Sequence, residues 1–222
     1  MKVRILRQQS PVSAPYWEEF AYDGPKDNSV AGMIDYLNYN DDLVDISGRK
    51  TARIGWECSC LQGICGACAM VINGVPRLAC ETFVRDLGDE IEVKPLQKFP
   101  VIHDLMVDRS SIQENLKRTN VYIGQYQPVG SKDPALQYSA ARCLKCGLCL
   151  EVCPNYVDGT TFYGAAFAND CYLTIMRNSD KKDQIKRVYN AHFGKDCSKS
   201  LACMDVCPMG IATIASIAKL NR

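Results

Sequence analysis

The sequence contains no run of about 18 uninterrupted apolar residues, so no segment is expected to span a membrane. Residues 1–7 alternate polar and apolar side chains and no long apolar segment follows them, so we also expect no export signal. Charge of one sign is lacking as well. The net charge of the 222 residues is +1, without a basic tract, and we therefore expect no nucleic-acid partner.

Residues typical of catalysis are equally scarce. The chain has two histidines, His103 and His192, and neither stands in a pattern typical of a nucleophilic site, so we expect both at the surface or in supporting contacts. No Gly-x-Gly-x-x-Gly motif is present, so this device does not bind a flavin or nicotinamide here. We expect no catalytic residue in this chain and place the substrate chemistry elsewhere.

Cysteine, in contrast, is abundant, with 13 residues. A secreted disulfide framework is disfavoured, because such frameworks belong mainly to short exported chains and the odd count leaves one thiol over. Zinc is the better rival for a lone C-x2-C pair, but the spacings below resemble no ordinary zinc layout. Free thiolates without an export signal favour a reducing cytoplasm.

The run at residues 143–154 reads C-L-K-C-G-L-C-L-E-V-C-P. Four cysteines at spacings of two, two and three residues, closed by a proline, are typical of a cubane iron-sulfur cluster. In proteins with two such clusters the last cysteine of the run ligates the other cluster, and a second set of cysteines does follow downstream. This rule assigns four ligands to a [4Fe-4S] cluster: Cys143, Cys146, Cys149 and Cys207.

Three cysteines then remain for the second cluster of this pair: Cys153, Cys197 and Cys203. A standard four-iron site would need another cysteine midway between Cys197 and Cys203, where this chain has Ser200. A hydroxyl is a poor iron ligand beside a thiolate, so we expect a [3Fe-4S] cluster with a raised reduction potential.

An upstream set has the plant-type spacing for a [2Fe-2S] cluster, and its members are Cys60, Cys65, Cys68 and Cys80. Gly63 and Gly66 interrupt the loop where the backbone must turn tightly near the sulfurs. Cys58 falls outside this frame, so we expect a buried or partly exposed free thiol. Cys171 lies in an apolar helical segment and is expected to fill the core.

The rest of the pattern predicts an α+β protein with two domains. Over residues 1–100 we expect a small open sheet with strands around Val3 and Ile5, at 16–22, on both sides of Asn73-Gly74, and around Ile91 and Val93. Ser29 is expected to cap a helix whose buried stripe is Val30, Met33, Ile34 and Leu37. Over residues 101–222 we expect helices at 133–143, 162–176, 181–193 and 211–220, the last with Ile211, Ile214, Ile217 and Ala218 on one stripe.

Several segments together resemble the iron-sulfur subunit of succinate dehydrogenases and fumarate reductases. They are residues 60–70, 72–74, 78–80 and 100–108, the Cys143 run, and residues 197–208. The resemblance covers nearly the whole chain, and the order and spacing of the motifs are specific.

The resemblance implies an N-terminal β-grasp plant-type ferredoxin domain followed by an α-helical bacterial-type ferredoxin domain. It implies [2Fe-2S], [4Fe-4S] and [3Fe-4S] clusters in line between an FAD-containing flavoprotein subunit and a quinone-binding membrane-anchor subunit. Such a chain passes single electrons between quinone and the flavin that interconverts fumarate and succinate. It would lie on the cytoplasmic side of the cytoplasmic membrane, held there by its partners.

Two departures bear on the quinone. Many ubiquinone-linked members carry a tryptophan soon after the cysteine-proline pair, where this chain reads N-Y-V at 155–157, and a histidine where it has Ser198. These differences favour a menaquinone-linked or a soluble enzyme. Alternatives are a soluble or thiol-linked fumarate reductase, disfavoured because no cysteine-rich segment follows up to Arg222, a free-standing multi-cluster ferredoxin, and a nucleic-acid or repair protein with structural clusters.

Overall fold

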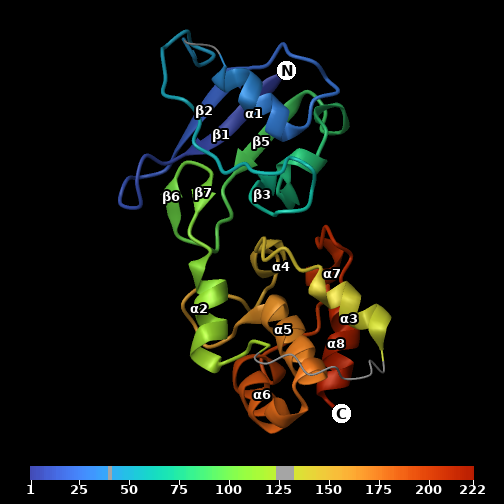
Figure 1. The fold of residues 1–222 in the computed structure, drawn as a ribbon. Coiled ribbons are helices and arrows are strands. Elements are labelled where there is room, and N and C mark those ends of the chain that lie inside the picture. The colour runs from blue at the N-terminus through green and yellow to red at the C-terminus, as the bar shows by residue number, and fades with distance from the viewer. Residues whose placement is uncertain (40–41, 124–132) are drawn as a thin grey trace. The chain divides into compact units, whose positions relative to one another are not determined.

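The structure, a computed structural model, describes residues 1–39, 42–123 and 133–222. The chain folds into two compact units, Met1–Asp108 and Arg109–Arg222. The first is built on a β-sheet and the second is helical (Figure 1). The division expected after residue 100 and the division seen in the structure differ by the short hairpin described below.

The first unit is built on a five-stranded mixed sheet with strand order β2-β1-β5-β3-β4. β1 and β2 pair antiparallel, as do β3 and β4, which confirms the two predicted hairpins. β5 pairs parallel with β1 and antiparallel with β3, and so joins the two hairpins into one sheet. The strands are β1 (Lys2–Arg7), β2 (Tyr16–Ala21), β3 (Ala69–Ile72), β4 (Val75–Leu78) and β5 (Glu90–Lys94).

Helix α1 (Val30–Asn38) lies against this sheet (Figure 1). The Ser29 side chain accepts a hydrogen bond from the Gly32 amide at 3.2 Å, so the predicted cap is confirmed. The predicted stripe is buried in full: Val30, Met33, Ile34 and Leu37. Between β3 and β4, Asn73 and Gly74 have φ angles of 46° and 77°, the left-handed pair that a tight hairpin turn requires.

Two short 3₁₀ helices, η1 (Ala79–Glu81) and η2 (Val84–Asp86), follow β4. After β5 comes a second hairpin, of β6 (Val101–His103) and β7 (Met106–Val107). The expectation that residue 101 begins the helical part is therefore wrong for this segment. Its strands are too short for a period-2 pattern to mark them, and Asp104, with a φ of 47°, makes the turn.

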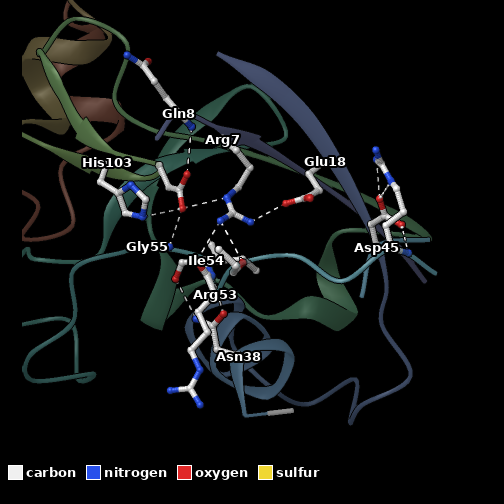
Figure 2. A network of polar contacts seen from close by, with 12 residues as sticks. Arg7, Gln8, Glu18, Asn38, Asp45, Arg53, Ile54, Gly55 and His103 are labelled. Atoms are coloured by element: carbon white, nitrogen blue, oxygen red, sulfur yellow. Dashed lines mark hydrogen bonds and ion pairs between the residues drawn. The ribbon is translucent and has the colours of Figure 1, made fainter. Parts of the chain in front are cut away.

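A buried arginine, Arg7 at the end of β1, holds this hairpin to the sheet. Its Nε lies 2.9 Å from Asp104 Oδ2 and its Nη1 2.6 Å from Glu18 Oε2, while Nη2 donates to the Arg53 carbonyl at 3.0 Å. Arg7, Glu18 and Asp104 are 1%, 9% and 0% exposed. Figure 2 shows the Arg7 guanidinium amid these partners. The Asp104 carboxylate also accepts from the Gly55 amide at 2.9 Å. One guanidinium thus connects two strands, the second hairpin and the segment that leads to Cys60.

The second unit is helical, and α5 (Gly164–Arg177) runs through its middle (Figure 1). It packs on α3, α4, α6 and α8 through alanine and aromatic side chains. The other helical elements are α2 (Ser110–Thr119), α3 (Pro134–Ala141), α4 (Leu148–Glu151), η3 (Ser179–Lys181), α6 (Lys182–Tyr189), η4 (Asn190–Gly194), α7 (Ala202–Asp205) and α8 (Thr213–Leu220). The four predicted helical segments are confirmed to within a few residues. α2 and the one-turn helices α4 and α7 were not predicted.

The predicted stripe of α8 is only half right. Ile211 and Ile217 are buried, but Ile214 is 38% exposed and Ala218 is exposed. The buried face of the helix consists of Thr213, Ser216, Ile217 and Leu220. Two hydroxyl side chains replace the expected apolar ones because this face lies beside the cysteine-lined cavities described below. In the described part of the chain, no helix has the length and apolar character needed to cross a bilayer.

The Arg7 arrangement makes a stability prediction. Arg7→Met would leave two buried carboxylates without their cation and should lower the free energy of unfolding of the first unit by about 3–5 kcal/mol. Urea unfolding followed by tryptophan fluorescence measures this, because Trp17 and Trp56 both lie in that unit. The control is Arg85→Met, which removes an ion pair whose side chains are 51% and 84% exposed and should cost less than about 1 kcal/mol. Equal losses in the two variants would contradict the role given to Arg7.

Candidate iron-sulfur centres

The structure brings the four cysteines of the upstream set together on a loop and at η1. Cys68 Sγ lies 3.3 Å from Cys80 Sγ, and both residues are buried. The side chains of Cys60 and Cys65 are hydrogen-bonded to each other. The four sulfurs thus form two neighbouring pairs, as a cluster of two irons with two thiolates on each iron needs.

Backbone amides point at these sulfurs. The Gln62 amide donates to Cys60 Sγ at 3.3 Å, and the Gly63 amide donates to Cys80 Sγ at 3.3 Å. The Gln62 amide is the largest cause that lowers the pKa of Cys60 to about 7, whereas burial raises the pKa of Cys80 to about 12. The loop therefore stabilises negative charge on sulfur at its rim, and its inner sulfur depends on a metal for compensation.

The turns of this loop need glycine at Gly63, as expected from the sequence. Its φ is +70°, and a Cβ added there would stand 2.7 Å from the Glu81 side chain. Gly66 has a φ of +79°. Backbone in this region brings the amides inward toward sulfur, which ordinary residues do only with strain.

In the second unit, four cysteines line one cavity of about 430 Å³ that is partly open to solvent: Cys143, Cys146, Cys149 and Cys207. Three come from the loop before α4 and from α4 itself, and the fourth follows α7. The Ile211 amide donates to Cys207 Sγ at 3.4 Å. The remaining lining is mainly apolar, with Leu144, Leu148, Ala166, Pro208, Met209 and Ile211.

A second cavity, of about 450 Å³, is lined by Cys153, Cys197 and Cys203. Ser200 also lines it, at the place where a fourth sulfur would be needed. Cys203 lines both cavities, and so does Thr213 at the start of α8. The two cavities are therefore neighbours that share a wall.

Burial controls the ionisation of these thiols. It raises the pKa of Cys146 and of Cys203 to about 11, and it raises the pKa of Cys143 and Cys149 as well. Near neutral pH these sulfurs are protonated unless a metal replaces the proton, so loading the site releases protons.

The donor set fits iron-sulfur clusters better than single ions. No two of the 13 cysteines form a disulfide, which speaks against the disulfide framework. Among the residues the structure describes, no three His, Cys, Asp or Glu side chains converge closely enough to hold one metal ion. Soft sulfur donors around an apolar cavity of this size suit a cluster of several irons.

Cys171 is fully buried in α5, which agrees with the core role predicted for it, and Cys58 is exposed. The histidines make structural contacts. His103 Nε2 lies 3.3 Å from Asp104 Oδ2, and the His192 ring stacks on Tyr163 with the centroids 4.2 Å apart.

Sequence reasoning missed the polar groups of the first cavity. Lys145 lines it and forms an ion pair with Asp170 of α5. Asn169, also in the lining, donates to Thr213 Oγ1 at 3.2 Å. The available signal was a pair of polar residues inside an otherwise apolar helix that faces the cysteine run.

Comparisons with known proteins agree with this geometry. Residues 2–114 match the family of 2Fe-2S iron-sulfur cluster binding domains, and residues 138–211 match the 4Fe-4S dicluster domains. The succinate dehydrogenase iron-sulfur subunit of Bacillus subtilis is 34% identical over 98% of this chain and 90% of its own length. The fumarate reductase iron-sulfur subunit of Escherichia coli is 28% identical over the same shares. A chain of the Mycobacterium smegmatis Sdh1 complex shares the fold, with a TM-score of 0.75 and 23% identity over 99% of this chain and 93% of its own.

The fold and the cysteine sites define an iron-sulfur protein with a 2Fe-2S ferredoxin-like domain and a helical 4Fe-4S dicluster domain, as the predicted fold class stated. Within that class, the chain belongs to the family of succinate dehydrogenase and fumarate reductase iron-sulfur subunits.

The geometry of Gly63 makes a second prediction. Gly63→Ala combines a left-handed backbone strain of about 1–3 kcal/mol with a clash at the loop that holds four sulfurs, so the [2Fe-2S] centre should be lost or depleted. Iron content and the visible absorption of the centre measure this loss. The matched control is Gly88→Ala, whose φ of +80° carries the same strain but which has nothing within 4 Å. Depletion in both variants alike would show that strain alone is responsible.

Proposed function

We propose that this chain relays single electrons within a succinate dehydrogenase or fumarate reductase complex. The partners are an FAD-containing flavoprotein subunit, which interconverts succinate and fumarate, and a quinone-binding membrane-anchor subunit. The chain binds peripherally, through these partners, at the cytoplasmic side of the cytoplasmic membrane. It makes and breaks no bond of the substrate.

The observation that carries the proposal is the grouping of eleven cysteines into three separate sites, two of them cavities that share a wall. Flavin and quinone exchange electrons in pairs, whereas an iron-sulfur cluster accepts one at a time. A row of clusters therefore splits a two-electron reaction into single steps. Membership of the family supplies the dicarboxylate chemistry.

We assign the ligands by site. The [2Fe-2S] cluster takes Cys60, Cys65, Cys68 and Cys80, the [4Fe-4S] cluster takes Cys143, Cys146, Cys149 and Cys207, and the [3Fe-4S] cluster takes Cys153, Cys197 and Cys203. The position of Ser200 in the lining of the second cavity supports the three-iron assignment, since a hydroxyl stands where a fourth thiolate would complete a four-iron site.

For the quinone we propose menaquinone. The segment after Cys153 carries Asn155, whose side-chain amide donates to the Asp196 carbonyl at 2.7 Å, and Ser198 lines the three-cysteine cavity. The side chains at these two positions therefore differ from the tryptophan and the histidine of many ubiquinone-linked members. Replacing menaquinone by ubiquinone in assays of the intact complex should lower turnover.

The three-iron assignment can be tested by one substitution. Ser200→Cys should supply a fourth thiolate, abolish the oxidised three-iron EPR signal and raise the iron content by one from about nine per chain. The matched control is Ser198→Cys, which adds a thiol to the same cavity two residues away and should leave the three-iron signal unchanged. A native protein that shows no oxidised three-iron signal would contradict the assignment outright.

The relay itself is tested on the complex purified from native membranes through a tag on this chain. A flavoprotein should co-purify, and succinate should reduce the clusters, seen as loss of the oxidised three-iron signal, with fumarate restoring it. The control adds malonate, a dicarboxylate that cannot be dehydrogenated, and should leave the signal in place. Clusters that are present but respond to neither substrate would overturn the proposed function.

A further inference from the structure

The cavity lined by Cys143, Cys146, Cys149 and Cys207 has one cationic side chain in its wall, that of Lys145. Lys145 lies between two of the cysteines in a left-handed conformation with a φ of 55°. This turn places its amide against Cys143 Sγ and its side chain along the cavity, where Nζ pairs with the Asp170 carboxylate. The two side chains are 25% and 16% exposed.

Buried charges of this kind need a reason, because removing two ions from water costs several kcal/mol per ion. Burial by itself lowers the pKa of Lys145, but attraction to Asp170 and to the Cys143 sulfur raises it above its usual value. The lysine is therefore a fixed cation near neutral pH. The rest of the lining offers no second cation of this kind among the described residues.

The charge of Lys145 reaches the cysteine sulfurs. Burial raises the pKa of Cys143, and the attraction of Lys145 together with its backbone amide opposes that rise. Cys149 is also among the groups whose negative charge Lys145 stabilises. Because the wall is apolar, such attraction is screened far less than it would be at the surface.

We propose that the Lys145–Asp170 pair sets the reduction potential of the cluster held in this cavity: Lys145 raises the potential, and Asp170 both positions the lysine and offsets part of its effect. This inference rests on the proposed [4Fe-4S] assignment. The physical reason is that one-electron reduction adds a negative charge to the cluster, so a nearby cation stabilises the reduced form more than the oxidised form.

A purely structural role is the rival explanation, since the same ion pair ties the cysteine run to α5. The two explanations differ in sign. If the pair only holds the cavity together, removing either member disturbs it in the same way. If its charges act on the cluster, removing the cation and removing the anion shift the potential in opposite directions.

The experiment is an EPR-monitored redox titration of the four-iron signal in the native complex. Lys145→Met should lower the potential and Asp170→Asn should raise it, each by about a tenfold change in the reduction equilibrium, which is about 59 mV for one electron. Lys145→Arg should stay near the native value, and the double variant should lie between the two single variants. The matched controls are Lys117→Met and Glu114→Gln, which change the same charges in an ion pair of the same unit that is 72% and 44% exposed, and they should shift nothing.

The outcomes are separable. A native complex without a four-iron signal would overturn the proposed function. An intact signal whose potential is unmoved, or moves with the same sign in Lys145→Met and Asp170→Asn, would overturn the role of the pair. Should Asp170→Asn fail to assemble, Lys145→Met against Lys145→Arg decides, because equal potentials in those two variants contradict the proposal.

Discussion

Buried cysteine sulfur is the group that most constrains this molecule. In the second unit the surroundings of Cys146 and Cys203 raise the pKa of both thiols to about 11, so each sulfur carries its charge only when iron compensates it. The segments that carry these sulfurs contribute one-turn helices, α4 and α7, which are too short to be stable by themselves. Cluster binding and folding of this unit are therefore coupled, and α5 supplies the packing surface that the short elements lack.

The first unit solves a different problem, which is to hold an irregular loop against a sheet. The segment before Cys60 contains little regular structure, and its backbone polar groups need partners. Arg7 and Asp104 provide them at Arg53 and Gly55, and the Asn38 side chain pairs with both backbone groups of Ile54 at 2.7 and 2.9 Å. Side chains from the sheet, from α1 and from the second hairpin thus fix the path of the chain just before the first cysteine of the set. The loop can then turn its amides toward sulfur.

Much of this could be predicted from the sequence, because the strongest signals are local. The Ser29 cap, the Asn73-Gly74 turn and the cysteine spacings each depend on a few neighbouring residues. What was missed depends on partners distant in sequence. The parallel pairing of β1 with β5 joins residues about ninety positions apart, and no local pattern encodes it. The second hairpin depends on Asp104, whose buried partner Arg7 lies at the other end of the unit's sequence. The exposure of Ile214 follows from the three-cysteine cavity that it lines.

The same distinction explains why the metal sites were readable and their electrostatics were not. Ligand spacing is a property of the chain, whereas the field at a cluster depends on which charges the fold brings to it. Lys145 stands in the cysteine run itself, yet its partner Asp170 is 25 residues away, and only the packing of α5 on α4 joins them. Cys203 makes the point for the neighbouring cavity, since a sulfur assigned to one cluster also lines the site of the other. A charge added to either cluster is therefore felt at the next one, so the local charges that set one potential also influence the step between the two.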